Sequence, residues 1–164
     1  MSATRSSSDF TFGPPLIGAL LRMPWESVQR HMLGRLHERG FDDLEAAHLT
    51  VFGYPGPHGT RPSELAARLR MSKQALNYLL GDLERLGYIE RHPDPDDRRA
   101  RRIALTERGR ALIPVIRGAV AETEREWAAA LGADRFAQLR ELLADLTGVV
   151  APETAAQVRR SGRA

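Results

Sequence analysis

Apolar residues recur at helical spacing through the middle of the chain. A short periodic segment, 65–69, precedes Met71 and Ser72, and a longer one follows with Leu76, Leu79, Leu80, Leu83 and Leu86. Spacings of three and four place these side chains on one face of a helix. Gly87 ends the second segment. The pattern predicts two helices joined by a tight turn, with Ser63 as N-cap of the first and Ser72 as N-cap of the second.

Two short β-prone runs follow the second helix. They are residues 88–91 and 102–105, and Pro93, Pro95 and three aspartates between them are turn formers. Thr60 and Arg61 can add a short third strand beside this hairpin. Helix, turn, helix and hairpin together form the layout of a winged helix-turn-helix, which docks on DNA.

Longer amphipathic patterns flank this unit. Residues 16–36 predict a helix with a kink or break near Met23, because Pro24 cannot donate an interior hydrogen bond. After Gly40, Asp42 or Asp43 is expected to cap a helix that contains Phe52. On the other side, Thr106 is expected to cap a long helix that Pro114 interrupts early and Gly132 ends. A last helix, 136–150, repeats apolar residues at spacings of three and four.

These flanking helices carry more apolar surface than one winged-helix core can cover. A second copy of the chain can bury the excess, and two-fold dimers are the commonest oligomer. We therefore expect a mainly α fold with a small β-hairpin wing. In that division, 41–105 is the DNA-binding lobe and the dimerisation helices are 14–40 and 106–150. The ends, 1–13 and 151–164, are expected to be a disordered tail and a flexible basic tail.

Composition narrows the function classes. The 164 residues carry a formal charge of +3, and the pI near 9.9 favours an anionic partner. The absence of cysteine excludes disulfides and thiolate sites within this sequence. No apolar run is long enough to span a membrane and no secretory segment is evident, so we expect a cytoplasmic protein that does not bind membranes.

The outward face at the start of the second helix carries the candidate base contacts. In this docking mode, N-terminal residues of the recognition helix reach base edges, and Asn and Gln pair with adenine while Lys contacts guanine or phosphate. The candidates are Ser72, Lys73, Gln74, Asn77 and Tyr78. An ordinary solvated helix face is the alternative reading.

Four arginines in five residues lie in the second half of the hairpin. Arg98, Arg99 and Arg101 are expected to reach the minor groove or phosphates, with Arg102 beside them. The alternative is a solvated charge run balanced by the neighbouring aspartates. Arg61 could touch phosphate as well, although a solvated loop arginine is the simpler reading.

The segments SELAARLRMSKQALNYLLGDLERLGYIER and PDPDDRRARRIALTERG resemble the helix-turn-helix and wing of the MarR family of bacterial transcriptional regulators. The close match covers roughly 61–111, with looser similarity from about 16 to 150. The resemblance implies that Asp97 and Arg99 form a pair that braces the wing, and that Arg99 or Arg98 reaches DNA. Many members carry an arginine where Tyr78 stands, which puts base readout there in doubt.

The resemblance also implies homodimerisation and regulation by a small aromatic or anionic effector. Trp25, His48, Phe52 and Tyr54 are the candidates for its pocket. Plain core packing is the alternative for Trp25 and Phe52.

We find no catalytic constellation, cofactor motif or metal-ligand spacing in the sequence. The sequence thus predicts a dimeric, DNA-binding transcriptional regulator, with double-stranded DNA and a second copy as partners, rather than an enzyme. It favours a repressor that binds a pseudo-palindromic operator. Two alternatives are a winged-helix protein–protein adaptor that does not read DNA and, less well supported, a small enzyme in the helical bundle.

Overall fold

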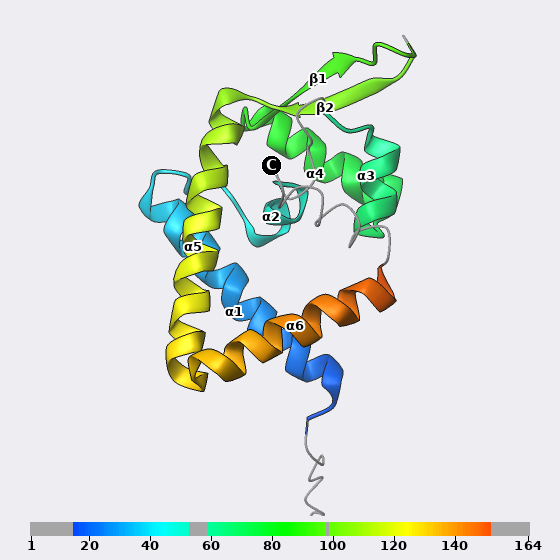
Figure 1. Cartoon of the computed structure of the whole chain (residues 1–164). Coiled ribbons are helices and arrows are strands. Elements are labelled where there is room, and N and C mark those ends of the chain that lie inside the picture. Colours follow the sequence, from blue (N-terminus) through cyan, green and yellow to red (C-terminus); the bar gives the residue numbers. More distant parts are fainter. Residues whose placement is uncertain (1–14, 53–58, 98, 152–164) are drawn as a thin grey trace, which may run out of the picture.

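The computed structural model describes residues 15–52, 59–97 and 99–151. These ranges contain six helices and one antiparallel hairpin (Figure 1). In chain order the elements are α1 (Ile17–Glu38), α2 (Ala46–Phe52), α3 (Pro62–Leu69), α4 (Lys73–Arg85), β1 (Ile89–Pro93), β2 (Arg101–Leu105), α5 (Glu107–Leu131) and α6 (Ala133–Val150). The predicted mainly α architecture with a small hairpin is confirmed. The tails expected at 1–13 and 151–164 lie outside the described residues, except for residue 151.

The first helix is longer and more regular than predicted. α1 runs through Pro24 without interruption, so a break near Met23, one of the two outcomes expected there, is wrong. Pro24 lies in an exposed part of α1, where water can satisfy the carbonyl group that loses its partner. Past the end of the helix, Gly40 adopts φ +86°, a conformation that favours glycine.

The second helix is capped differently from the prediction. α2 begins at Ala46, so neither Asp42 nor Asp43 is its cap. The Glu45 N–H donates instead to Nδ1 of His48 at 3.0 Å. A side chain three residues into the helix thus accepts from the backbone at its start, as in a capping box.

The caps around the helix-turn-helix are confirmed in part. Pro62 occupies the first position of α3 after Arg61, so the predicted Ser63 cap is wrong. Ser72 is the N-cap of α4, and its Oγ accepts the Ala75 N–H at 3.1 Å. Between the helices, Arg70 adopts the left-handed conformation, φ 52°, which closes the turn.

The hairpin pairs Ile89 with Leu105 and Pro93 with Arg101. Thr60 and Ile103 exchange two backbone hydrogen bonds, of 3.0 and 2.9 Å, so the predicted third strand exists as an isolated bridge. Gly59 lies so close to this pairing that a Cβ there would be 2.8 Å from the Ile103 oxygen. Its φ of +73° also requires glycine.

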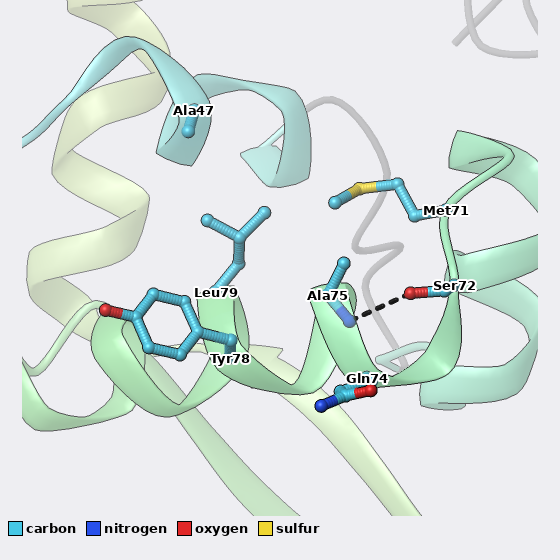
Figure 2. A pocket seen from close by; sticks show the side chains of 7 residues that line it. All are labelled: Ala47, Met71, Ser72, Gln74, Ala75, Tyr78 and Leu79. Carbon is cyan, nitrogen blue, oxygen red and sulfur yellow. Dashed lines mark hydrogen bonds between the residues drawn. The ribbon is translucent and has the colours of Figure 1, made fainter.

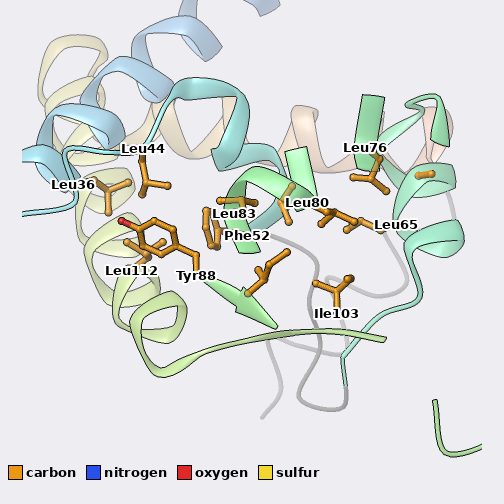
Figure 3. Packing of buried hydrophobic residues seen from close by; sticks show 13 residues of the cluster. Leu36, Leu44, Phe52, Leu65, Leu76, Leu80, Leu83, Tyr88, Ile103 and Leu112 are labelled. Atoms are coloured by element: carbon orange, nitrogen blue, oxygen red, sulfur yellow. The ribbon is translucent and has the colours of Figure 1, made fainter. Parts of the chain in front are cut away.

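One core joins the helix-turn-helix to the start of the long helix (Figure 3). Tyr88 is fully buried, with Phe41 and Phe52 against its ring. Its hydroxyl donates to Asp43 at 2.5 Å, and the Arg108 guanidinium lies 4.4 Å above its ring centroid while also pairing with Asp43. Burial raises the pKa of Tyr88, and the hydrogen bond to the Asp43 carboxylate raises it further. This contact explains why Asp43 is not a helix cap.

α5 begins and ends as predicted, whereas α6 begins at Ala133, three residues before its predicted start. Thr106 caps α5, its Oγ1 accepting the Gly109 N–H at 3.0 Å, and Gly132 ends it. α5 runs through Pro114, so the interruption expected there is wrong, and α5 packs along α1. The apolar stripe of α5 is used within the chain, because Leu112 and Ala119 are buried. The faces left uncovered are the first turns of α1 and much of α6.

Candidate nucleic-acid interface

The predicted recognition residues share the exposed start of α4. Lys73, Gln74, Asn77 and Tyr78 are all exposed, and Tyr78 exposes 77% of its surface. The opposite face of α4, with Leu76, Leu80 and Leu83, is buried in the core. The apolar spacing therefore fixes which polar side chains point outward. Together with the N-cap Ser72, these four residues lie at one end of one helix.

That helix end also suits an anion. The first N–H groups of an α-helix lack helical acceptors, and they carry the positive end of the helix dipole. In α4 the Ser72 hydroxyl satisfies only the Ala75 N–H. Lys73 adds a side-chain cation at the same end. The start of α4 can therefore accept phosphate oxygens as well as present Gln74 and Asn77 to base edges.

The wing arginines divide into two groups. Arg99 and Arg101 are exposed, and in the described part of the chain no carboxylate forms an ion pair with either guanidinium. Arg102 is engaged, since its Nε donates to Asp94 at 2.9 Å and its Nη2 lies 3.5 Å from Asp96. Arg98 lies outside the described residues. Among the described residues, the guanidinium groups of Arg99 and Arg101 are thus available to bind an external anion.

Asp97 contacts Arg99 through the backbone. Its Oδ1 accepts the Arg99 N–H at 3.0 Å, and its carbonyl accepts the Ala100 N–H at 2.9 Å. This is the turn that aspartate side chains commonly stabilise. The bond shapes the tip of the hairpin, and it leaves the Arg99 guanidinium available.

A different aspartate, which the sequence did not single out, forms the buried ion pair of the wing. The Asp94 side chain is fully buried, and its Oδ2 accepts from Arg61 Nε at 2.6 Å and from Arg102 Nε at 2.9 Å. These guanidinium groups, with Arg61 first, hold the pKa of Asp94 far below its usual range. The expectation that Arg61 is a solvated loop arginine is therefore wrong. Three nearby aspartates look alike in the sequence. The pairing of Thr60 with Ile103 brings the adjacent Arg61 to the hairpin, where Asp94 is the aspartate that accepts from it.

Of the four residues expected to line an effector pocket, one is exposed on α1 and two are buried on α2. Trp25 lies on α1 with 54% of its surface exposed, whereas Phe52 and His48 are buried on α2. Phe52 packs in the core, and His48 Nε2 lies 3.3 Å from Asp82 Oδ2 on α4. Tyr54 lies outside the described residues. His48 therefore links α2 to α4.

A groove of about 610 Å³ lies between α2 and α4 (Figure 2). Its lining comes from α2, the turn before α4 and α4 itself: Ala47, Met71, Ser72, Gln74, Ala75, Tyr78 and Leu79. Figure 2 shows Leu79 and Met71 facing the gap below Ala47. The lining is mostly apolar with polar groups at the edge, as small-molecule sites commonly are.

Within 15–52, 59–97 and 99–151, no group of three or more His, Cys, Asp or Glu residues could hold a metal ion. Over the same ranges, none of the helices has the length and apolar character needed to cross a membrane.

Comparisons with known proteins give a consistent result. A sequence model described as the MarR family matches residues 42–100. The HTH-type transcriptional regulator PecS of Dickeya dadantii (strain 3937) is 31% identical over 109 residues, 66% of this chain and 63% of PecS. The regulator YkoM of Bacillus subtilis (strain 168) is 29% identical over 92 residues, 56% of this chain and 58% of YkoM. The matches thus span less than two thirds of either curated relative.

Solved structures extend the likeness over most of the chain. Wild-type MarR from E. coli in its apo form is 27% identical, with a TM-score of 0.66, covering 81% of this chain and 97% of MarR. MepR from S. aureus, solved as a MepR–DNA complex, is 21% identical with a TM-score of 0.66, covering 84% of this chain and all of MepR. The predicted winged-helix fold class is confirmed by these matches.

Proposed function

The chain belongs to the MarR family of transcriptional regulators, and from this premise we propose that it binds duplex DNA in a sequence-specific way. The observation that carries the proposal is the exposure of two DNA-suited surfaces at one end of the molecule. These are the polar start of α4 and the free arginines of the wing, Arg99 and Arg101. Figure 1 places the hairpin, α3 and α4 together, away from α6.

Each surface has a distinct task in the proposed complex. Gln74 and Asn77 read base edges in the major groove, while Lys73 and the helix end hold a phosphate. Arg99 and Arg101 bind phosphates or enter the minor groove next to it. Tyr78 contributes its ring as a contact surface, where an arginine stands in many relatives. The DNA complex of MepR supports this docking mode at the level of the fold.

We propose further that the protein acts as a homodimer. Apolar side chains without cover gather on the first turns of α1 and on α6, with Ile17 67%, Leu142 60% and Val149 79% exposed. Contiguous exposed apolar surface of this kind marks an interaction site. A two-fold dimer through these helices places two α4 helices about 34 Å apart, one turn of DNA, and the operator is then pseudo-palindromic.

An effector-responsive repressor in the cytoplasm is the form of regulation we propose. The groove between α2 and α4 is a better candidate for the effector site than a pocket lined by Trp25, His48 and Phe52. The side chains of His48 and Phe52 are buried in internal contacts, whereas the groove is open to solvent. A ligand there would contact Gln74 and Tyr78 and so compete with base contacts or move α4. If a broad set of aromatic carboxylates leaves operator affinity unchanged, this part of the proposal loses its support.

The test of the main proposal starts with DNA fragments selected from the source genome by the purified protein. Affinity for the selected duplex and for a scrambled one is then measured over a range of salt. Gln74→Ala and Asn77→Ala should each reduce discrimination between the two duplexes by about 1–3 kcal/mol per lost base contact. Gln138→Ala, the same change at an exposed site on α6, should leave discrimination unchanged. Absence of salt-dependent binding to any duplex would favour the adaptor alternative.

A further inference from the structure

We propose that Asp94 positions the wing on the duplex, by tying the tip of the hairpin to the loop that begins α3. The inference rests on the proposed DNA-binding function, since the wing is taken to contact DNA. It assigns to a buried carboxylate, which touches no DNA itself, the control of where Arg99 and Arg101 are held.

The position of Asp94 in the hairpin is the first argument. The strand ladder ends at the pair Pro93–Arg101, and Asp94 follows immediately. Its N–H donates to the Ala100 carbonyl at 3.1 Å, and its Oδ1 accepts the Asp96 N–H at 2.9 Å. Asp94 therefore closes the base of the tip, and among the described tip residues Asp96 and Ala100 are hydrogen-bonded directly to it.

The second argument is the connection across elements. Arg61 immediately precedes α3, and its Nε bonds to Asp94 Oδ2 at 2.6 Å. The neighbouring Thr60 pairs with Ile103, whose side chain is fully buried in the core. The hairpin is thus fixed near its middle by the backbone bridge and near its tip by the ion pair. Two separated attachments restrict bending of the hairpin against α3 and α4, which one attachment cannot do.

The third argument is the burial of the charge. A buried carboxylate is costly unless several donors satisfy it. Asp94 accepts from two guanidinium groups and one backbone N–H, and Arg61 and Arg102 remain only 33% and 24% exposed at their side chains. Two of the cations near the wing are thereby committed to internal bonds. The arginines left for DNA are the ones that the buried cluster holds in place.

A purely electrostatic role and a positioning role of Asp94 predict opposite changes in DNA affinity for the substitution Asp94→Asn. Asp94→Asn removes one negative charge per chain and releases guanidinium groups close to the proposed DNA surface. If charge alone mattered, affinity for DNA would rise. If Asp94 positions the wing, affinity falls, because the tip must be ordered again on binding. A fall in affinity is therefore specific to the positioning role.

The experiment compares Asp94→Asn with Asp96→Asn in the full chain. The Asp96 side chain is 77% exposed. Asp96→Asn therefore removes the same charge from the same turn without disturbing a buried carboxylate. We expect Asp94→Asn to weaken binding to the selected duplex by about tenfold, within the range of coupled residues in one network. Asp96→Asn should bind as tightly as the wild type or more tightly. In an Arg99→Ala/Arg101→Ala background, Asp94→Asn should have no further effect, because the contacts that it positions are gone.

A second readout does not need DNA. Amide exchange at the wing tip, at Asp96 and Ala100, should be faster in Asp94→Asn and unchanged in Asp96→Asn. If the wild type binds no duplex in a salt-dependent way, the proposed function fails while this readout still tests the tether. If Asp94→Asn does not fold, Asp94→Glu keeps the charge but displaces the carboxylate, and it should still weaken binding. Unchanged or tighter binding by a folded variant, a loss that persists in the double-alanine background, or unchanged exchange would each overturn the inference.

Discussion

Replacing Arg99 by alanine should reduce both the affinity for DNA and its dependence on salt. Arg99 is exposed and, among the described residues, its guanidinium has no carboxylate partner, so its charge is available to phosphate. Each neutralised phosphate contributes about 0.9 to the slope of log affinity against log salt. In a homodimer the substitution acts in both wings, so the slope should fall by about 1.8.

This change in slope has a measurable size. Between about 50 mM and about 200 mM salt, a slope difference of about 1.8 lowers the ratio of wild-type affinity to variant affinity by about 12-fold. Fluorescence anisotropy with one labelled duplex over that range measures it. The loss should be the same for selected and scrambled duplexes, because a phosphate contact carries no sequence information.

A matched control separates the wing from the total charge. Arg140→Ala also removes one cation per chain, but Arg140 lies on α6 and pairs with Glu124 at 3.2 Å. It should leave the slope unchanged. If Arg99→Ala and the wild type show the same affinity and the same slope, the assignment of the wing as a DNA contact is refuted.

Three further predictions concern stability and assembly. Gly109→Ala should destabilise the fold by about 2 kcal/mol in urea unfolding, because the new Cβ would lie 2.1 Å from the Tyr88 carbonyl oxygen; a stability equal to the wild type would contradict this packing. The hydrogen bond from His31 lowers the pKa of Glu122 in the folded protein, so its stabilisation is present above the unfolded pKa and is lost as pH falls through the folded pKa; Glu122→Gln should flatten the acid side of the stability profile, and an unaltered profile would count against the contact. Leu142→Glu should weaken a dimer by at least on the order of 50-fold in sedimentation, since two half-exposed leucines lose their burial; unchanged dimerisation would exclude this face.

The sequence predicted what depends on local periodicity and capping. The spacing of Leu76, Leu80 and Leu83 determined which side of α4 is buried, and the hydroxyls of Ser72 and Thr106 lie where the caps were expected. The same spacing placed Gln74 and Asn77 outward. These features need only residues within a few positions of one another, so a single sequence is sufficient for them.

The errors arose where distant residues compete for a local group. Asp43 resembled a helix cap, but Tyr88, 45 positions later, donates to it and a different residue starts α2. Asp94 was one of three similar aspartates until Arg61, 33 positions earlier, was brought next to it. Among the effector candidates, His48 has a distant partner of the same kind, because its ring lies against Asp82 on α4. Only the fold shows which partner is near.

The unbroken course of α5 has a mechanical consequence. Its 25 residues correspond to about 37 Å at 1.5 Å per residue. One end abuts the strand junction at Tyr88, where Gly109 permits almost no gap, and the other end turns into α6. A tilt of about 5° of such a rod displaces its far end by roughly 3 Å. In the proposed homodimer, a small change in how the two subunits meet would therefore alter the separation of the two α4 helices by ångströms, without any loss of helical structure.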